Sequence, residues 1–184
     1  EPYHAGKFGS NSIWYTWTAP ASGIATFRTV GSTFDTLLGI YTNEVQRSTF
    51  NAQHSTLNLV SVAEDEDLGG YLTSQLQFNA VEGVEYQIAV DGFAGQQGTF
   101  ILSWELEPTT NTVPVITNAP VSQTVPEGAT ATFTVGASGN GLTYQWYGNN
   151  KLLTGATTAT LTVSNVQAVD VGLWMVRVSN STGR

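Results

Sequence analysis

Two stretches of this chain alternate strictly between apolar and polar side chains, and this period of two residues restricts the fold more than any other feature. Alternation of this kind is typical of a strand with one buried face, whereas a helix repeats every 3.6 residues. Each stretch carries four apolar residues on one face: Val84, Tyr86, Ile88 and Val90, then Phe100, Leu102, Trp104 and Leu106. Further strands are predicted over 12–18, 23–30, 36–42, 57–63 and 73–79, between turns rich in Gly and Pro. The sequence predicts an all-β fold.

The segment 107–114 lacks alternation and contains Pro108 and Pro114, as a short, stiff linker does. The charge changes at the same place. Through Glu107 the chain carries twelve acids and three bases, whereas the remainder carries two acids and three bases. We therefore predict two tandem β-sandwich domains, residues 1–106 and 115–184, joined by a linker over 107–114.

Composition excludes several classes of function. The formal net charge is −8 with six basic residues in all, so binding to nucleic acid or to an anionic membrane surface is disfavoured. No apolar run approaches the roughly 20 residues of a membrane-spanning helix. There is no cysteine, which rules out disulfides and thiolate metal sites. His4 and His54 lie in polar segments without a nucleophile motif beside them, so we predict no enzymatic activity and no catalytic residue.

Several spaced motifs mark the second half of the chain. A segment with a central tryptophan, 144–147, is followed by a strand-like segment, 159–163, and by the D-x-G stretch 170–176. In this pattern the chain resembles bacterial immunoglobulin-like domains of the I-set type, over roughly 70 residues. The resemblance puts Val135 and Val176 at the two positions of the family's disulfide and Trp174 at its tyrosine-corner position.

Such sandwiches continue into a final strand, which this sequence lacks because it stops at Arg184. Two interpretations stay open. The chain is a cut fragment, or a neighbouring chain supplies the strand to an open sheet edge.

The first half resembles bacterial pre-peptidase C-terminal (PPC-like) domains. The residues that carry this resemblance are 12–23, 34–42, 64–70, 76–80 and 86–93. It implies a sandwich of jelly-roll type that forms an accessory part of a large secreted protein, and hence an extracellular or cell-surface location. Members usually have one or two strands before the position of Glu1. Some relatives bind calcium or extracellular polymers.

The densest cluster of charge is the run Glu64, Asp65, Glu66 and Asp67, followed by two glycines. Calcium takes six to eight oxygen ligands, and Asp65, Glu66 and Asp67 would supply some of them. The others would come from Glu1, Asp35 or Asp91. Equally open is a solvated acidic turn, in which Asp35 and Asp91 bond nearby backbone N–H groups.

Aromatic residues suggest a second candidate site. Alternation separates Trp14 from the face formed by Ile13, Tyr15 and Trp17. Trp14, Tyr3, Tyr71 and Phe93 could form a platform for stacking on sugars; the alternative is that they cover a sheet edge or an inter-domain contact.

We expect a non-catalytic adhesion or spacer segment of a large secreted or cell-surface bacterial protein. Its partners would be neighbouring modules of the same polypeptide or fibre. A carbohydrate- or matrix-binding module of a secreted hydrolase and a fibre subunit joined by strand completion remain as alternatives.

Overall fold

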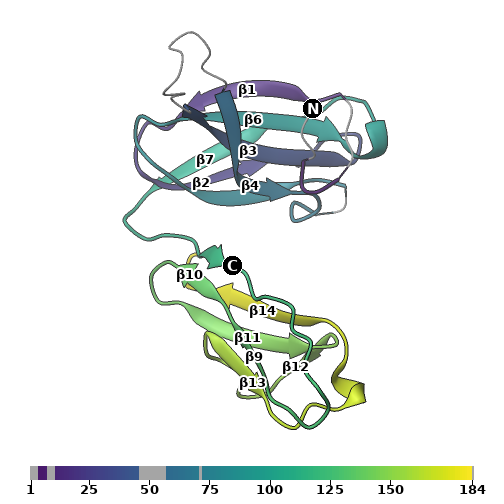
Figure 1. The fold of residues 1–184 in the computed structure, drawn as a ribbon. Helices are drawn as coiled ribbons and strands as arrows, with labels where there is room; N and C mark the ends of the chain where they lie inside the picture. The colour runs from purple at the N-terminus through teal and green to yellow at the C-terminus, as the bar shows by residue number, and fades with distance from the viewer. Residues whose placement is uncertain (1–3, 8–10, 46–56, 71, 184) are drawn as a thin grey trace, which may run out of the picture. The chain divides into compact units, whose positions relative to one another are not determined.

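The computed structural model describes residues 4–7, 11–45, 57–70 and 72–183. The chain divides into two compact units, Glu1–Thr110 and Asn111–Arg184 (Figure 1). Both are built from strands, and the only helical elements among the described residues are single 3₁₀ turns, Phe93–Gly95 and Ala168–Asp170. The predicted all-β class is therefore confirmed. No helix in the described part of the chain has the length and apolar character needed to span a membrane.

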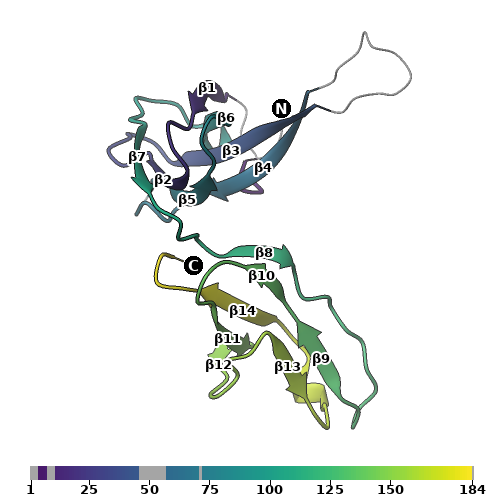
Figure 2. The same cartoon turned by 90° about the vertical axis from the view of Figure 1, so that its left-hand side faces the viewer.

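The first unit is a sandwich of two antiparallel sheets. One sheet has the order β1-β6-β3-β4 and the other has the order β5-β2-β7 (Figure 2). The strand bounds are β1 Ile13–Thr18, β2 Gly23–Arg28, β3 Thr36–Val45, β4 Leu57–Asp65, β5 Gln75–Ala80, β6 Glu85–Gly92 and β7 Ser103–Pro108.

The core of this unit lies between the two sheets. Tyr86, Ile88 and Val90 of β6 are each 2% exposed, and Phe27 of β2 and Phe78 of β5 face them. In β1 the register places Ile13, Tyr15 and Trp17 opposite these same β6 residues. The register thus confirms that these three residues of β1 share the face of the β6 residues, and of the three Trp17 packs against the core while Ile13 and Tyr15 remain exposed.

The strand that ends the first unit starts and stops later than predicted. Phe100 and Leu102 pack against the core, but β7 begins only at Ser103. It continues through Pro108, which pairs with Gly23 of β2. Because β7 is an edge strand, a proline is tolerated there.

The linker is also shorter at its other end than the predicted 107–114. The carbonyl of Thr112 accepts hydrogen bonds from Asn180 Nδ2 at 2.7 Å and Thr182 Oγ1 at 2.9 Å. Val113 is buried in the second unit. Only residues 109–111 therefore lie between Pro108, which pairs in the first unit, and Thr112, which is bonded in the second.

The second unit packs short sheets around one tryptophan. The sheet β12-β11-β14 faces the pairs β13-β9 and β10-β8. The strand bounds are β8 Val115–Asn118, β9 Ala131–Thr134, β10 Gly136–Ser138, β11 Thr143–Gly148, β12 Lys151–Leu152, β13 Thr160–Val163 and β14 Trp174–Ser179.

Trp146 of β11 is completely buried, and its indole nitrogen donates to the carbonyl of Thr158 at 2.9 Å. Val135 is buried in the same cluster, and Val176 packs against it. The two valines at the disulfide positions therefore fill the core as hydrophobic residues, as the sequence predicts.

Candidate functional site

The four consecutive acids of the first unit do not act as one cluster. Glu64 and Asp65 end β4, and because side chains alternate along a strand they point in opposite directions. Glu64 accepts a hydrogen bond from the Tyr41 hydroxyl at 2.6 Å. Asp65 is turned inward and is 7% exposed.

The Asp65 carboxylate closes the turn that follows β4. Its Oδ2 atom accepts backbone N–H groups of Leu68 at 2.9 Å and Gln75 at 2.8 Å. Burial raises the pKa of Asp65, and these N–H donors partly offset that effect. Gly69 is needed in this turn because a Cβ there would come within 2.7 Å of the Ser74 carbonyl oxygen.

The other two acids lie in the turn itself. Glu66 forms an ion pair with Lys7 at 3.2 Å, and the Lys7 ammonium lies 5.7 Å from the centre of the Phe93 ring. Burial raises the pKa of Asp35, and the charges of Asp67 and Glu66 raise it further. Asp35 is therefore close enough to feel the charges of three residues, Lys7, Glu66 and Asp67.

The Asp91 side chain bonds backbone N–H groups, as the turn interpretation expects, whereas the contacts of Asp35 are made by its own backbone. Asp91 is 2% exposed, and its Oδ1 atom accepts the N–H groups of Gly92 at 2.7 Å and Asn11 at 3.2 Å. Asp35 accepts the Phe93 N–H on its own carbonyl at 2.9 Å. Its Oδ1 atom is buried and has no hydrogen-bond partner among the residues that the structure describes.

The predicted calcium ligands therefore contact different partners. Glu1 lies outside the described residues. Within the described ranges, no group of three or more His, Asp or Glu side chains is arranged to hold a metal ion. Calcium binding stays a prediction from the sequence.

The aromatic residues of the predicted sugar platform are engaged with other side chains. Trp14 is half-buried, with ring centres 5.5 Å from both His4 and Tyr41. Its indole nitrogen donates to Ser12 Oγ at 2.8 Å. Phe93 lies under Lys7, and Tyr3 and Tyr71 fall outside the described residues. Trp14 is thus engaged by His4, Tyr41 and Ser12, and sugar binding by this group stays a prediction from the sequence.

A buried chain of polar contacts was missed by the sequence analysis. His4 is completely buried, and its Nδ1 atom lies 2.7 Å from the Tyr41 hydroxyl, which donates onward to Glu64. Burial raises the pKa of Tyr41, and the hydrogen bond to Glu64 and the charge of that carboxylate add to the effect. The unbroken apolar run Leu37–Tyr41 could have indicated that Tyr41 is buried, because a strand without alternation is covered on both faces.

Exposed aromatic surface gathers where β1 and β7 approach each other. The rings of Trp17 and Trp104 have centres 5.2 Å apart, and those of Tyr15 and Phe100 lie 6.3 Å apart. Tyr15 and Trp104 nevertheless remain 43% and 49% exposed. This edge of the sandwich, rather than Trp14, therefore offers aromatic rings to solvent.

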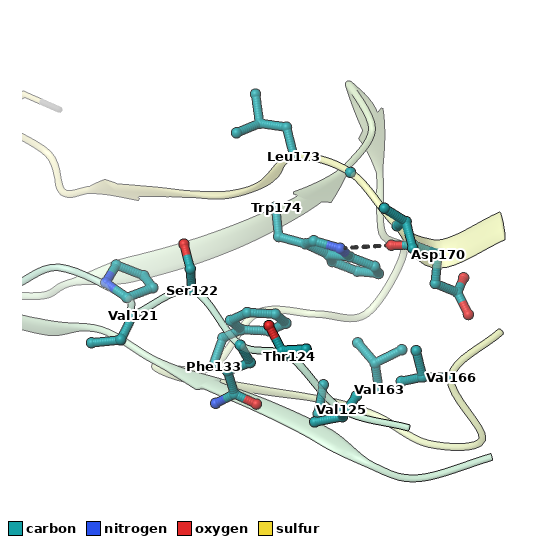
Figure 3. A pocket seen from close by; sticks show the side chains of 15 residues that line it. Val121, Ser122, Thr124, Val125, Phe133, Val163, Val166, Asp170, Leu173 and Trp174 are labelled. Carbon is teal, nitrogen blue, oxygen red and sulfur yellow. Dashed lines mark hydrogen bonds between the residues drawn. The ribbon is translucent and has the colours of Figure 1, made fainter. Parts of the chain in front are cut away.

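Two hollows in the described part of the second unit border β14. The first has a volume of about 380 Å³ and lies between Trp174 and the segment 120–125 (Figure 3). Its floor is formed by the stacked rings of Phe133 and Trp174 and by Val163. The second, of about 450 Å³, is lined by Met175–Val178, Tyr147, Pro114 and Ile116. Both linings are largely apolar side chains.

Comparison with known proteins finds a family model for the second unit alone. Residues 113–180 match the family model described as immunoglobulin domain. The second unit is an immunoglobulin-like sandwich. No curated protein matches the chain. A solved structure described as "Structural basis for Dscam isoform specificity" is similar at 17% identity with a TM-score of 0.36. That match covers 96% of this chain and 44% of the other, so this chain spans less than half of the protein it resembles.

Proposed function

We propose that the chain is a non-catalytic adhesion or spacer segment of a larger secreted or cell-surface bacterial protein. The observation that carries the proposal is that two β-sandwich units, each with a core of its own, follow one another with only a few residues between them. Immunoglobulin-like modules commonly serve as such repeated building units, and the short link between the units contains few residues that can change conformation independently.

Resemblance supports the extracellular part of the proposal. The segments that resemble PPC-like domains coincide with β1, the start of β3, the acidic turn and β6. Modules of that family accompany larger secreted proteins, so the first unit would be such a module and the second would space or present it.

Pulling the full chain from its two ends in a single-molecule force experiment tests the spacer role. Two independent units should give two unfolding events, with contour lengths of roughly 400 and 270 Å for 110 and 74 residues. One event that releases the whole chain would contradict the proposal. Adhesion is tested separately, by screening the immobilised chain against bacterial and host polysaccharides and matrix proteins.

A carbohydrate-binding role is the second candidate, and the exposed rings of Tyr15 and Trp104 favour it. Sugars stack on such rings, and substitution of both residues by alanine would then abolish retention on a polysaccharide. Trp14→Ala serves as the comparison, because Trp14 is engaged with His4 and Tyr41. Equal loss in both variants would point to unfolding rather than to a sugar site.

A third candidate is a fibre subunit joined by strand completion. An added strand would pair with β14, which ends the sheet β12-β11-β14 among the described residues.

A further inference from the structure

Residues 139–141 form an open bend between β10 and β11. Gly139 and Gly141 flank Asn140 there, and the φ angles of the two glycines are 139° and 61°. Residues with a side chain rarely adopt such angles, so the bend depends on its glycines. A Cβ added at Gly141 would meet no atom within 4 Å, and Asn140 is exposed. Solvent therefore reaches both residues.

Asn140 and Gly141 form the one Asn-Gly pair of the sequence, and such a pair can react with itself. The glycine nitrogen attacks the side-chain carbonyl carbon of the asparagine, because glycine has no side chain to hinder the approach. The new N–Cγ bond closes a succinimide ring. The Cγ–Nδ2 bond breaks, and the amide nitrogen leaves as ammonia with the proton of the glycine nitrogen. Water then opens the ring at one of its two carbonyl carbons, which leaves a carboxylate where the amide was.

The groups that would react are not held by other parts of the described chain. The N–H of Gly141 donates to no backbone carbonyl there. The contact that Asn140 makes with a described residue is at its backbone carbonyl, not at its side chain. Asn180 is the contrasting case, because its Nδ2 donates to two carbonyls and its Oδ1 accepts the Thr182 N–H at 2.9 Å. The Asn140 amide is therefore free to approach the glycine nitrogen, whereas the Asn180 amide is held.

The reaction would reach the start of the second unit through Asn180. Its Nδ2 atom lies 2.9 Å from the Asn140 carbonyl oxygen and 2.7 Å from that of Thr112. When water opens the ring on the backbone side, the main chain continues through the Asn140 side chain and gains one methylene carbon. The former backbone carbonyl then becomes a free carboxylate. Asn180 loses the acceptor that it now has, so the contact that it shares with Thr112 must change.

The new charge also matters for this part of the chain. Residues 108–184 carry three bases and two acids, a net charge of +1, and one added carboxylate brings this to zero. A protein with no net charge associates more readily than a charged one.

We propose that Asn140 is a site of spontaneous deamidation, with water as the co-reactant, and that the conversion rearranges the contact by which Asn180 holds Thr112. The open bend carries the first part of the proposal and the two bonds of Asn180 carry the second. The conversion needs neither an enzyme nor a bound partner, and it does not depend on the spacer role.

The first test compares the full chain with the capped peptide of residues 138–142 in mildly alkaline buffer, which promotes loss of the proton from the glycine nitrogen. Isoelectric focusing follows the gain of one negative charge, and digestion with mass spectrometry locates it. We expect the chain to react within about tenfold of the peptide rate, because an open bend needs little prior unfolding. Greater slowing would overturn the proposal. A site that reacted only from the unfolded state would be slower by about a thousandfold or more.

One substitution assigns the reaction to its residue. Asn140→Gln keeps an amide and the backbone carbonyl, but the longer side chain closes a larger ring far more slowly, so the gain of charge should disappear. Asn150→Gln changes another exposed asparagine and should leave the gain of charge as it is. An equal gain in Asn140→Gln and in the unaltered chain would overturn the proposal.

NMR spectra of the converted chain test the contact with Thr112. We expect the side-chain amide signals of Asn180 and the backbone signals of Thr112 to shift as the charge appears. The same incubation of Asn140→Gln should shift neither. Unchanged Asn180 signals in fully converted chain would overturn the second part of the proposal.

Discussion

The indole nitrogen of Trp174 donates a hydrogen bond to the backbone carbonyl of Asp170 at 3.1 Å (Figure 3). This bond joins β14 to the last residue of the 3₁₀ turn Ala168–Asp170. In the same turn the Asp170 carboxylate accepts the Gln167 N–H at 2.8 Å. A tyrosine at this corner of related sandwiches bonds backbone a few residues upstream. Trp174 makes the equivalent bond through its N–H, and its ring stacks on Phe133.

Replacing Trp174 by phenylalanine removes that donor but keeps an aromatic ring beside Phe133. The Asp170 carbonyl loses its partner, so we expect the free energy of unfolding of the second unit to fall by about 1–2 kcal/mol. Chemical denaturation of the full chain measures this. Trp104→Phe in the first unit is the matched control and should leave the second unit unchanged. An unaltered stability of Trp174→Phe would show that the bond contributes nothing net.

The paired valines allow a direct test of the core alignment. Val135 and Val176 both contact the cluster around Trp146. With both replaced by cysteine, we expect a disulfide to form under oxidising conditions and to close a loop of about 40 residues. The chain-entropy relation puts its stabilisation at about 4 kcal/mol. Comparison of the oxidised and reduced double variant measures the gain, and failure of the cysteines to oxidise would contradict the alignment.

Sequence patterning predicted most of the strands because they have one buried face. The faces of β1 and β6 follow directly from alternation, and the register confirms them. The position of Trp146 in the core and the apolar role of Val135 followed instead from the resemblance to immunoglobulin-like domains. Local alternation does not need tertiary contacts to be recognised, which explains why these elements were correct.

The features that depend on tertiary contacts were not predictable in the same way. Nothing near His4 in the sequence indicates that it is buried against Tyr41, because the two are 37 residues apart. The acid run appeared as one site, yet strand alternation sends Glu64 and Asp65 to opposite sides. Pro108 was assigned to a linker because its position on an edge strand depends on β2, which is distant in sequence.

Tyr41→Phe isolates the contribution of one hydroxyl group in the first unit. The substitution removes both the contact to His4 Nδ1 and the hydrogen bond to Glu64 while the ring stays beside Trp14. Hydrogen bonds to charged groups contribute about 1.5–3 kcal/mol, so we expect a loss in that range for the first unit alone. Tyr15→Phe, on the exposed edge, should cost much less. Equal effects of the two substitutions would mean that the buried chain of contacts is not stabilising.

Acidic pH should stabilise the first unit. The folded pKa values of Asp35 and Asp65 are raised above the ordinary value of 3.8, mainly by burial. The folded state therefore binds more protons than the unfolded state just above that value, and the free energy of unfolding rises as pH falls through the raised pKa values of these two groups. Urea unfolding at several pH values measures this slope. The double variant Asp35→Asn with Asp65→Asn should lose much of it, and an unchanged slope in that variant would refute the assignment.

Calcium addition distinguishes an ion site from an acidic turn. Asp65 and Asp91 each accept two backbone N–H groups, and Glu66 is paired with Lys7. These carboxylates thus serve separate contacts, and in the described ranges no group of three or more of them is arranged to hold an ion that takes six to eight oxygens. We therefore expect the first unit to unfold at the same temperature in chelator and in millimolar calcium. Binding to the folded state alone would instead stabilise it by about 2.7 kcal/mol at a hundredfold excess over the dissociation constant. A rise of that kind, abolished by Asp65→Asn with Asp67→Asn, would contradict this expectation and establish the acidic turn as a calcium site. The same rise in the double variant would place the ion elsewhere in the chain.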